Sequence, residues 1–203
     1  MPSPHSVYIG CDDLENLPAI NRENWLFELE WLAKHLPKKA SVLQVGCMDG
    51  TRILRLLELR PDLSMTGLDI DDALIECARE NFKAAKQTVP LILADITTTD
   101  CQEHFDVVLC LNNTLGYIAE SDRALKQMKR LGDTVIVSVY GEAFTDQRAK
   151  EYFATIGLQY DAIVDNVFRM HDFAQVRRYT RNDVEGWNGK ITETPLGYLC
   201  KIG

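Results

Sequence analysis

Four short polar or glycine-containing segments each follow an apolar run, and their side chains are the ones in this sequence best suited to ligand chemistry. They are Gly46-Cys47-Met48-Asp49-Gly50, Asp69-Ile70-Asp71, Asp95-Ile96 and Asn112-Asn113-Thr114. Glycines allow a backbone to approach a ligand closely, and carboxylates accept strong hydrogen bonds from hydroxyl groups. The four segments therefore predict a site for a nucleotide-like cofactor.

The apolar runs before these segments indicate buried strands, with stretches of helical spacing between most of them. We expect strands at residues 41–45, 64–68, 91–94, 105–111 and 134–139. Strands that alternate with helices form a parallel sheet covered on both faces, and ligands bind at the carboxyl ends of such strands. The sequence thus predicts an α/β fold, a three-layer doubly wound sheet in which the four segments converge.

Polar residues mark the expected helix boundaries. Asp71 and Asp72 suit the positive end of a helix over the following residues. Ser121 is expected to cap a helix at 122–131, and Thr145 to cap one at 146–155. A further helix at residues 24–36 precedes the first strand, and we expect it to pack on the sheet edge.

The last third of the chain has a different pattern. Residues 164–179 and 196–202 are strand-like, with no long helix between them, so the two runs most simply form an antiparallel pair at the sheet edge. No repeat or linker divides residues 1–203, and we expect one domain with residues 1–40 as a helical cover. This cover and residues 141–172 are expected to close the site, which favours a small molecule as substrate.

Composition excludes several classes of function. The formal net charge of -8 argues against nucleic acid as a partner. No segment reaches the roughly 18 apolar residues of a membrane helix, and the chain lacks a signal-peptide pattern, so we expect a cytoplasmic protein without membrane contact. The 6 cysteines and 4 histidines lack ligand spacing, so no metal site is expected. No sequence pattern requires a homodimer, and a homodimer remains possible.

Two cofactor classes use a layout of this kind, and the first loop distinguishes them. A dinucleotide-binding loop has the pattern Gly-x-Gly-x-x-Gly, whereas this loop has only Gly46 and Gly50. Asp69 stands at a distance that suits a ribose-binding acid in either class. Three features count against a nicotinamide-dependent oxidoreductase: the missing glycine, Asp95 after the third strand, and the two strand-like runs at the end of the chain. An oxidoreductase of this kind remains an alternative.

The segments VLQVGCMDG, GLDID, LADI and FDVVLCLNNTLGYI, in this order and at these separations, resemble the successive motifs of class I S-adenosylmethionine-dependent methyltransferases. The resemblance covers about residues 20–140. It implies a Rossmann-like, mostly parallel seven-stranded sheet with an antiparallel last strand. It also implies S-adenosylmethionine as cofactor, S-adenosylhomocysteine as product, and methyl transfer to a nitrogen or oxygen atom of a small-molecule acceptor.

The same resemblance implies a role for each segment. The loop at 46–50 would lie against the methionine part of the cofactor, Asp69 would accept from both ribose hydroxyls, and Ile70 would lie on the adenine. Asp95 would bind the adenine amine beside the Ile96 backbone, with a simple turn as the alternative. The implied cofactor-binding residues are Gly46, Cys47, Met48, Asp49, Gly50, Asp69, Ile70, Asp95, Ile96, Leu111 and Asn112.

The family has no universal catalytic residue, because in-line methyl transfer depends mainly on holding two atoms in position. The candidates for contact with the reacting groups are Asn112, Asn113, Tyr117 and Tyr140. The candidates for contact with the acceptor are Tyr8, Trp25, Asn113, Tyr117 and Tyr140. The competing interpretation of the aromatic residues Tyr117 and Trp25 is packing in the core. The competing interpretation of Asn112 and Asn113 is that they form a turn.

Two residues depart from the family's pattern. Gln44 stands where an acid is usual, and Met48, which favours ordinary backbone angles, stands where glycine is usual. We hypothesise that Asp49 supplies the missing carboxylate; the alternative is that it caps the helix from Thr51. These departures leave open a relative with impaired cofactor binding that acts as an interaction protein.

Overall fold

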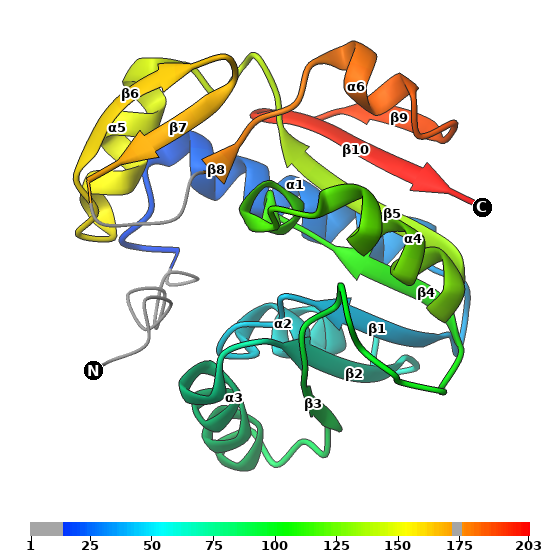
Figure 1. Ribbon diagram of the computed structural model, residues 1–203. Coiled ribbons are helices and arrows are strands. Elements are labelled where there is room, and N and C mark those ends of the chain that lie inside the picture. Colours follow the sequence, from blue (N-terminus) through cyan, green and yellow to red (C-terminus); the bar gives the residue numbers. More distant parts are fainter. Residues whose placement is uncertain (1–13, 172–175) are drawn as a thin grey trace.

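The protein is described by a computed structural model that covers residues 14–171 and 176–203. Its main feature is a seven-stranded sheet in the order β3-β2-β1-β4-β5-β10-β9 (Figure 1). The strands are β1 Ser41–Val45, β2 Ser64–Asp69, β3 Leu91–Leu93, β4 Phe105–Cys110, β5 Gly132–Tyr140, β9 Lys190–Glu193 and β10 Gly197–Ile202. Strands β1 to β5 pair in parallel, and β10 lies antiparallel between β5 and β9. The predicted seven-stranded α/β fold is confirmed.

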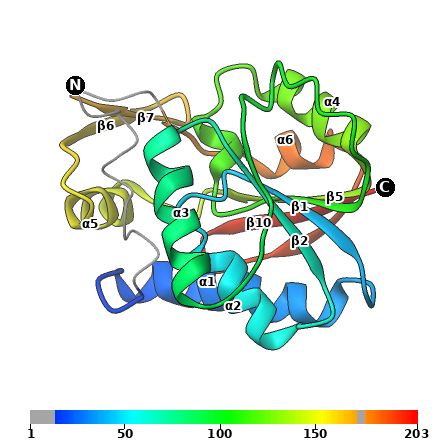
Figure 2. The same cartoon turned by 90° about the horizontal axis from the view of Figure 1, so that it is seen from below.

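Helices cover both faces of the sheet, which makes three layers (Figure 2). On these faces lie α1 Ala19–His35, α2 Thr51–Leu59, α3 Asp72–Ala84, α4 Ser121–Leu131 and α6 Arg181–Glu185, with a 3-10 turn at Thr114–Tyr117. Helix α5 Asp146–Thr155 packs instead in a third buried cluster, with Phe168 and Val176. One buried cluster joins α1, α2 and α3 to the sheet, and a second joins α4 to its other face. Because the central strands are covered twice, β1 and β4 are apolar and buried along nearly their whole length.

Helix α1 lies on a face of the sheet, so the predicted position at its edge is wrong. Trp25, Leu29 and Leu32 share a buried cluster with Val107 of β4 and Ile136 of β5. The helix also begins at Ala19, five residues before the predicted start at 24. Its row of apolar side chains covers central strands that would otherwise be exposed to water. Burial of these strands removes more apolar surface from water than burial of an edge would, and so it stabilises the fold more.

The predicted pairing of residues 164–179 with 196–202 is also wrong. A separate three-stranded sheet forms from β6 Tyr160–Val164, β7 Val167–Met170 and β8 Val176–Arg177. Asp165 and Asn166 connect its first two strands with φ of 51° and 63°, as a two-residue hairpin turn requires. The partner of β10 at the sheet edge is β9, which the sequence pattern did not predict.

Of the three polar residues or pairs predicted to mark helix starts, two cap their helices in the structure. The Asp71 side chain caps α3 by accepting from the backbone N–H groups of Ala73 and Leu74, and Thr145 caps α5. Ser121 is the first residue of α4, and Glu120 precedes it as the cap without a side-chain hydrogen bond. No helix within residues 14–171 and 176–203 is long and apolar enough to cross a membrane.

Candidate cofactor-binding site

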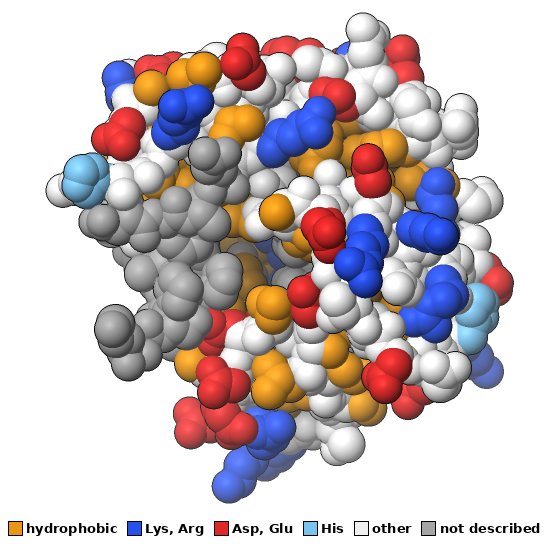
Figure 3. All heavy atoms as spheres, viewed as in Figure 1, with side chains coloured by type: hydrophobic (Ala, Val, Ile, Leu, Met, Phe, Trp, Pro, Cys, Tyr) orange, Lys and Arg blue, Asp and Glu red, His pale blue; other side chains and the backbone are white. Residues whose placement is uncertain are grey.

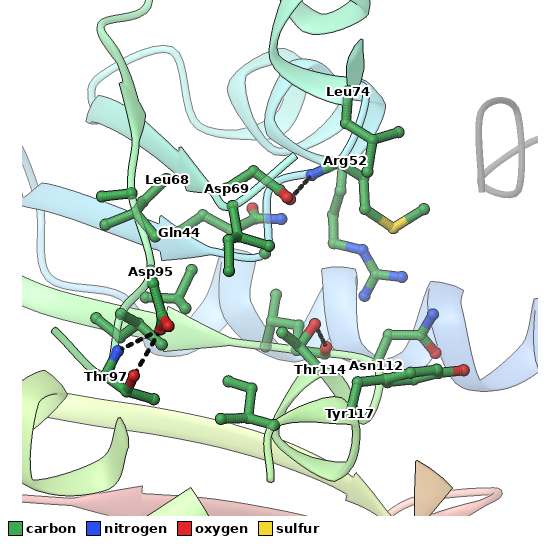
Figure 4. Close-up of a pocket in the computed structure, with 18 of the residues that line it drawn as sticks. Gln44, Arg52, Leu68, Asp69, Leu74, Asp95, Thr97, Asn112, Thr114 and Tyr117 are labelled. Atoms are coloured by element: carbon green, nitrogen blue, oxygen red, sulfur yellow. Dashed lines mark hydrogen bonds between the residues drawn. The ribbon is translucent and has the colours of Figure 1, made fainter. Parts of the chain in front are cut away.

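A cavity of about 340 Å³ lies at the carboxyl ends of the parallel strands (Figure 4). Its lining comes from the segments after β1, β2, β3 and β4. Figure 3 shows the surface hollowed near the middle of one face of the molecule. The chain order reverses between β1 and β4, and ligands of open α/β sheets bind at such a point. The volume lies within the roughly 300–1,000 Å³ of small-molecule sites.

The loop after β1 forms one wall of this cavity. Gly46 and Gly50 have φ of 68° and 77°, where glycine is favoured. A Cβ on Gly46 would also lie 2.4 Å from Cγ2 of Thr114, so no larger residue fits. The backbone N–H groups of Gly46 and Cys47 both donate to the Leu68 carbonyl, at 2.8 and 3.1 Å. The loop is therefore fastened to the end of β2.

Met48 adopts a left-handed backbone conformation with a φ of 51°, so the expectation of ordinary angles is wrong. Its N–H donates to Oδ2 of Asp69 at 2.9 Å, which holds the peptide in this orientation. A non-glycine residue pays about 1–2 kcal/mol for that conformation. The hydrogen bond to a buried carboxylate offsets part of this cost.

Two of the five loop residues, Gly46 and Met48, line the cavity. Cys47 and Asp49 are buried outside the lining, with 1% and 5% of their surfaces exposed. Oδ1 of Asp49 accepts from the N–H of Thr51, the first residue of α2, at 3.0 Å, while Gly50 occupies the N-cap position of that helix. Burial raises the pKa of the Cys47 thiol, which therefore stays protonated at neutral pH.

Asp69 ends β2 and places a buried carboxylate against the cavity. It is 6% exposed, and its two oxygens accept from the N–H groups of Met48 at 2.9 Å and Asp71 at 3.1 Å. Burial raises the pKa of Asp69, and the backbone hydrogen bonds oppose that effect. Ile70 follows with 57% of its surface exposed and also lines the cavity. A carboxylate that accepts hydrogen bonds and an apolar side chain thus stand next to each other in the cavity wall.

Asp95 both closes a turn and lines the cavity. Its Oδ1 accepts from the N–H of Thr97 at 2.7 Å and from the Thr97 hydroxyl at 2.8 Å (Figure 4). Ile96 and Thr97 line the cavity beside it. The sequence suggests either a turn or a ligand contact for Asp95, and in this geometry the same side chain can serve both.

The segment after β4 separates its two asparagines. Asn112 lines the cavity, as does Leu111, and Oδ1 of Asn112 accepts from the Tyr140 hydroxyl at 3.2 Å. Asn113 is fully buried outside the lining, where its amide donates to the Arg177 carbonyl and its Oδ1 accepts from the N–H of Tyr140. Asn113 therefore ties the segment to β5 and β8.

The aromatic candidates also separate. Tyr117 lines the cavity, whereas Tyr140 and Trp25 are each 1% exposed and lie outside the lining. Burial raises the pKa of Tyr140 well above its ordinary value, so its hydroxyl stays protonated. Tyr8 lies outside the described residues.

Arg52 and Tyr152 line the cavity and were not identified from the sequence. Arg52 is 4% exposed and forms an ion pair with Glu28 of α1, with 2.5 Å between Nη1 and Oε2. Its guanidinium also lies over the Trp25 ring, 4.9 Å from the centroid. The available signal was an acid, Glu28, on the same helix face as buried apolar residues of α1.

Gln44, the fourth of the five residues of β1, also lines the cavity. Its side chain is buried, and within the described part of the chain its Oε1 has no hydrogen-bond partner. A buried amide oxygen without a partner costs free energy. A ligand that donates a hydrogen bond to it would recover that cost.

Residues 42–132 match a protein family described as "Methyltransferase domain". The chain is 42% identical over 94 residues to a carboxy-S-adenosyl-L-methionine synthase from Campylobacter concisus, in an alignment that covers 46% of this chain and 39% of that protein. It thus spans about two fifths of the length of such curated relatives. A release factor glutamine methyltransferase from Streptococcus pneumoniae is 27% identical over 198 residues, which are 92% of this chain and 70% of that protein.

Solved structures show the same fold at low sequence identity. A Pyrococcus horikoshii protein superimposes with a TM-score of 0.73 at 19% identity, covering 97% of this chain and 96% of that one. An amino pentose methyltransferase from Micromonospora echinaspora, with S-adenosylmethionine bound, gives 0.67 at 18% identity, with 87% and 90% covered. The match over residues 42–132 and these structures together show that the chain is similar in sequence and fold to S-adenosylmethionine-dependent methyltransferases.

Proposed function

We propose that this protein transfers a methyl group from S-adenosylmethionine to a nitrogen or oxygen atom of a small-molecule acceptor. The observation that carries the proposal is one cavity in which Gly46, Asp69, Asp95 and Asn112 meet at the switch point of the sheet. These residues come from four different strand ends, in the order that the family's motifs require. The family match supports the same cofactor.

The residues of the cavity fit the parts of this cofactor. The Asp69 carboxylate suits the ribose hydroxyls, and the exposed face of Ile70 suits the adenine ring. Asp95 and Ile96 also line the cavity and would hold the adenine from the segment after β3. Oε1 of Gln44, which has no hydrogen-bond partner among residues 14–171 and 176–203, suits the ammonium of the methionine part. This neutral amide would take the place of the acid that is usual in the family. We assign no contact with the cofactor to Asp49, because its buried side chain lies outside the cavity lining.

S-adenosylmethionine supplies a methyl group on a positively charged sulfur. The protein's task is to exclude water and to hold the attacking atom in line with that methyl group, because orientation supplies much of the acceleration. Asn112 and Tyr117 lie on the wall after β4 and are the residues that we assign to orienting the acceptor. Asn113 and Tyr140 support that wall from behind through their hydrogen bonds.

A small acceptor agrees with the names of two proteins of the same fold. They are the amino pentose methyltransferase and a sugar N-methyltransferase from Streptoalloteichus, the latter with a TM-score of 0.63 at 16% identity. The cavity size also suits a cofactor and a small partner molecule.

A second candidate function comes from the Campylobacter relatives, which are named for synthesis of a carboxylated cofactor. The cation of Arg52 in the cavity lining favours it, because a guanidinium can bind a carboxylate. Mass spectrometry of the cofactor after turnover separates the two functions. Methyl transfer leaves S-adenosylhomocysteine, whereas the second function leaves a cofactor heavier than S-adenosylmethionine.

A thermal-shift and turnover experiment tests the proposal. We expect S-adenosylhomocysteine to raise the melting temperature and methyl-labelled S-adenosylmethionine to label a member of a panel of small amines and alcohols. A rise with nicotinamide dinucleotide alone would instead favour an oxidoreductase. No shift with either ligand would favour an interaction protein with an impaired site.

A further inference from the structure

Arg52 places a positive charge in the wall of the cavity. It stands in the first turn of α2, and it is the one lysine or arginine among the described residues that line the cavity. The same lining includes three acids, Asp69, Asp95 and Glu120. Its side chain is 4% exposed. An arginine buried to this extent loses hydration, so a charged partner must compensate for it.

Glu28 is that partner, and a network holds it rigidly. One carboxylate oxygen, Oε2, accepts from Nη1 of Arg52 at 2.5 Å. The other, Oε1, accepts from the Asn24 amide at 2.9 Å and from the Ser138 hydroxyl at 2.7 Å. The Trp25 ring supports the guanidinium from one face. The side chain of Arg52 is therefore fixed before any ligand arrives, which lowers the entropy cost of binding.

The same network reaches the wall on which the acceptor is expected. Oγ of Ser138 donates to Glu28 and also accepts from the N–H of Asn112 at 2.7 Å. Figure 4 shows the Arg52 guanidinium pointing into the cavity, toward Asn112 and Tyr117 and away from Asp95. One set of hydrogen bonds thus positions both the cation and the residue assigned to the acceptor.

A guanidinium carries five N–H donors, so the bond to Glu28 does not exhaust its capacity. Its planar geometry matches a carboxylate, with which it forms paired, charge-assisted hydrogen bonds.

We propose that the Arg52 end of the cavity is a carboxylate-binding subsite and that the acceptor carries the carboxylate. The acceptor is then a small acid, such as an amino acid or a hydroxy acid. This inference rests on the proposed function for the identity of the cofactor beside it. The α-carboxylate of the cofactor offers the same chemistry, and the test separates the two sources.

The test uses a paired variant, because removal of Arg52 alone would leave Glu28 as an uncompensated buried charge. Glu28→Gln with Arg52→Gln removes both charges and keeps hydrogen-bonding amides in their place. The matched control is Arg55→Gln on the same helix, where Arg55 pairs with Glu58 at the surface. Circular dichroism and the melting temperature confirm that each variant is folded.

Calorimetry then compares two pairs of ligands that differ in a carboxylate. The first pair is S-adenosylhomocysteine and its decarboxylated analogue. The second pair is benzoate and benzamide, each titrated into protein saturated with S-adenosylhomocysteine. We expect the parent and the Arg55→Gln control to prefer benzoate by about tenfold, the contribution of a charge-assisted hydrogen bond. The paired variant should lose that preference and keep the preference of the first pair.

Other outcomes overturn the proposal in distinct ways. If the paired variant loses the preference for S-adenosylhomocysteine over its decarboxylated analogue, the carboxylate belongs to the cofactor and the assignment to the acceptor is wrong. If neither preference changes, Arg52 has only a structural role. If the parent does not bind S-adenosylhomocysteine, the proposed function fails; benzoate against benzamide on the protein alone then still decides whether the subsite exists.

Discussion

Two walls of the same cavity are built in different ways. The cofactor wall, our name for the proposed cofactor contacts Gly46, Met48, Asp69 and Ile70, is fixed by backbone N–H groups. Those of Gly46 and Cys47 donate to the Leu68 carbonyl, and those of Met48 and Asp71 donate to the Asp69 carboxylate. The acceptor wall, defined as Arg52, Asn112, Tyr117 and Tyr152, depends on side chains far apart in the sequence. Glu28 and Ser138, for example, are 110 residues apart.

The difference separates two physical tasks. Backbone groups and glycines set the shape that a common cofactor needs, and their positions follow from short sequence motifs. Side-chain networks set the shape that one acceptor needs, and they can change without changes to the sheet. We therefore expect changes in the cofactor wall to weaken ligand binding most, and changes behind the acceptor wall to lower stability most.

Among changes in the loop after β1, the largest effect on affinity is expected from Gly46→Ala. The added Cβ would meet the Thr114 side chain at 2.4 Å, in a backbone conformation with a φ of 68°. A shift of the loop by about 1 Å should weaken binding of S-adenosylhomocysteine by about a hundredfold, measured by calorimetry.

Gly157→Ala is the matched control for that change. Gly157 has a φ of 72°, but a Cβ added to it would meet no heavy atom within 4 Å. The Gly157→Ala variant should lose about 1 kcal/mol of unfolding free energy, and its affinity for S-adenosylhomocysteine should not change. Equal loss of affinity in both variants would show that the loop geometry is not the cause.

Glu28→Ala should have the largest effect on stability. It removes the carboxylate that pairs with the buried Arg52 guanidinium, which costs about 3–5 kcal/mol of unfolding free energy. Urea denaturation measures the loss, with the exposed Glu30→Ala on the same helix as the control, expected within about 0.5 kcal/mol. A loss below about 1 kcal/mol would mean that water or other groups replace Glu28 with ease.

A smaller effect on the cofactor wall should come from pH. The carboxylate of Asp69 must be ionised to accept hydrogen bonds from two hydroxyls, and burial raises its pKa. Affinity for S-adenosylhomocysteine should therefore be complete at neutral pH. It should fall on acidification at a higher pH than the ordinary aspartate value of about 3.9 predicts. Calorimetry at a series of pH values measures the midpoint, and a midpoint at or below the ordinary value contradicts the account.

The smallest effect is expected outside both walls, at His104. Its Nε2 bonds to Oδ1 of Asp133 at 2.9 Å, and this hydrogen bond raises the pKa of His104. A raised pKa in the folded state stabilises the protein below the unfolded pKa of about 6.5, and the gain is lost as pH rises through the folded value. His104→Gln should lower the melting temperature slightly at about pH 5.5 and leave it unchanged at about pH 8.5. Ligand affinity should not change at either pH.

Sequence patterns predicted the elements whose causes are local. The starts of β1, β2, β3 and β4 at residues 41, 64, 91 and 105 coincide with the predictions, because each begins where an apolar run begins. The caps Asp71 and Thr145 were predicted for the same reason, since a side chain there bonds to backbone a few residues later.

Features with distant causes could not be predicted. The ion pair of Arg52 with Glu28 joins residues 24 apart on two helices, and no spacing rule connects them. The hairpin at Asp165 and Asn166 left a weak signal, because neither residue is a glycine and both nevertheless adopt positive φ. The edge strand β9 has only four residues, and its partner β10 determines its position.

The most direct test of the central claim is calorimetric titration with S-adenosylhomocysteine of the parent, Asp69→Ala and Asp72→Ala. Asp72 is an exposed acid three residues from Asp69, so it controls for loss of charge in the same region. We predict micromolar binding by the parent and by Asp72→Ala, and no measurable binding by Asp69→Ala. Equal binding by all three proteins, or none by the parent, would contradict the assignment of this cavity to S-adenosylmethionine.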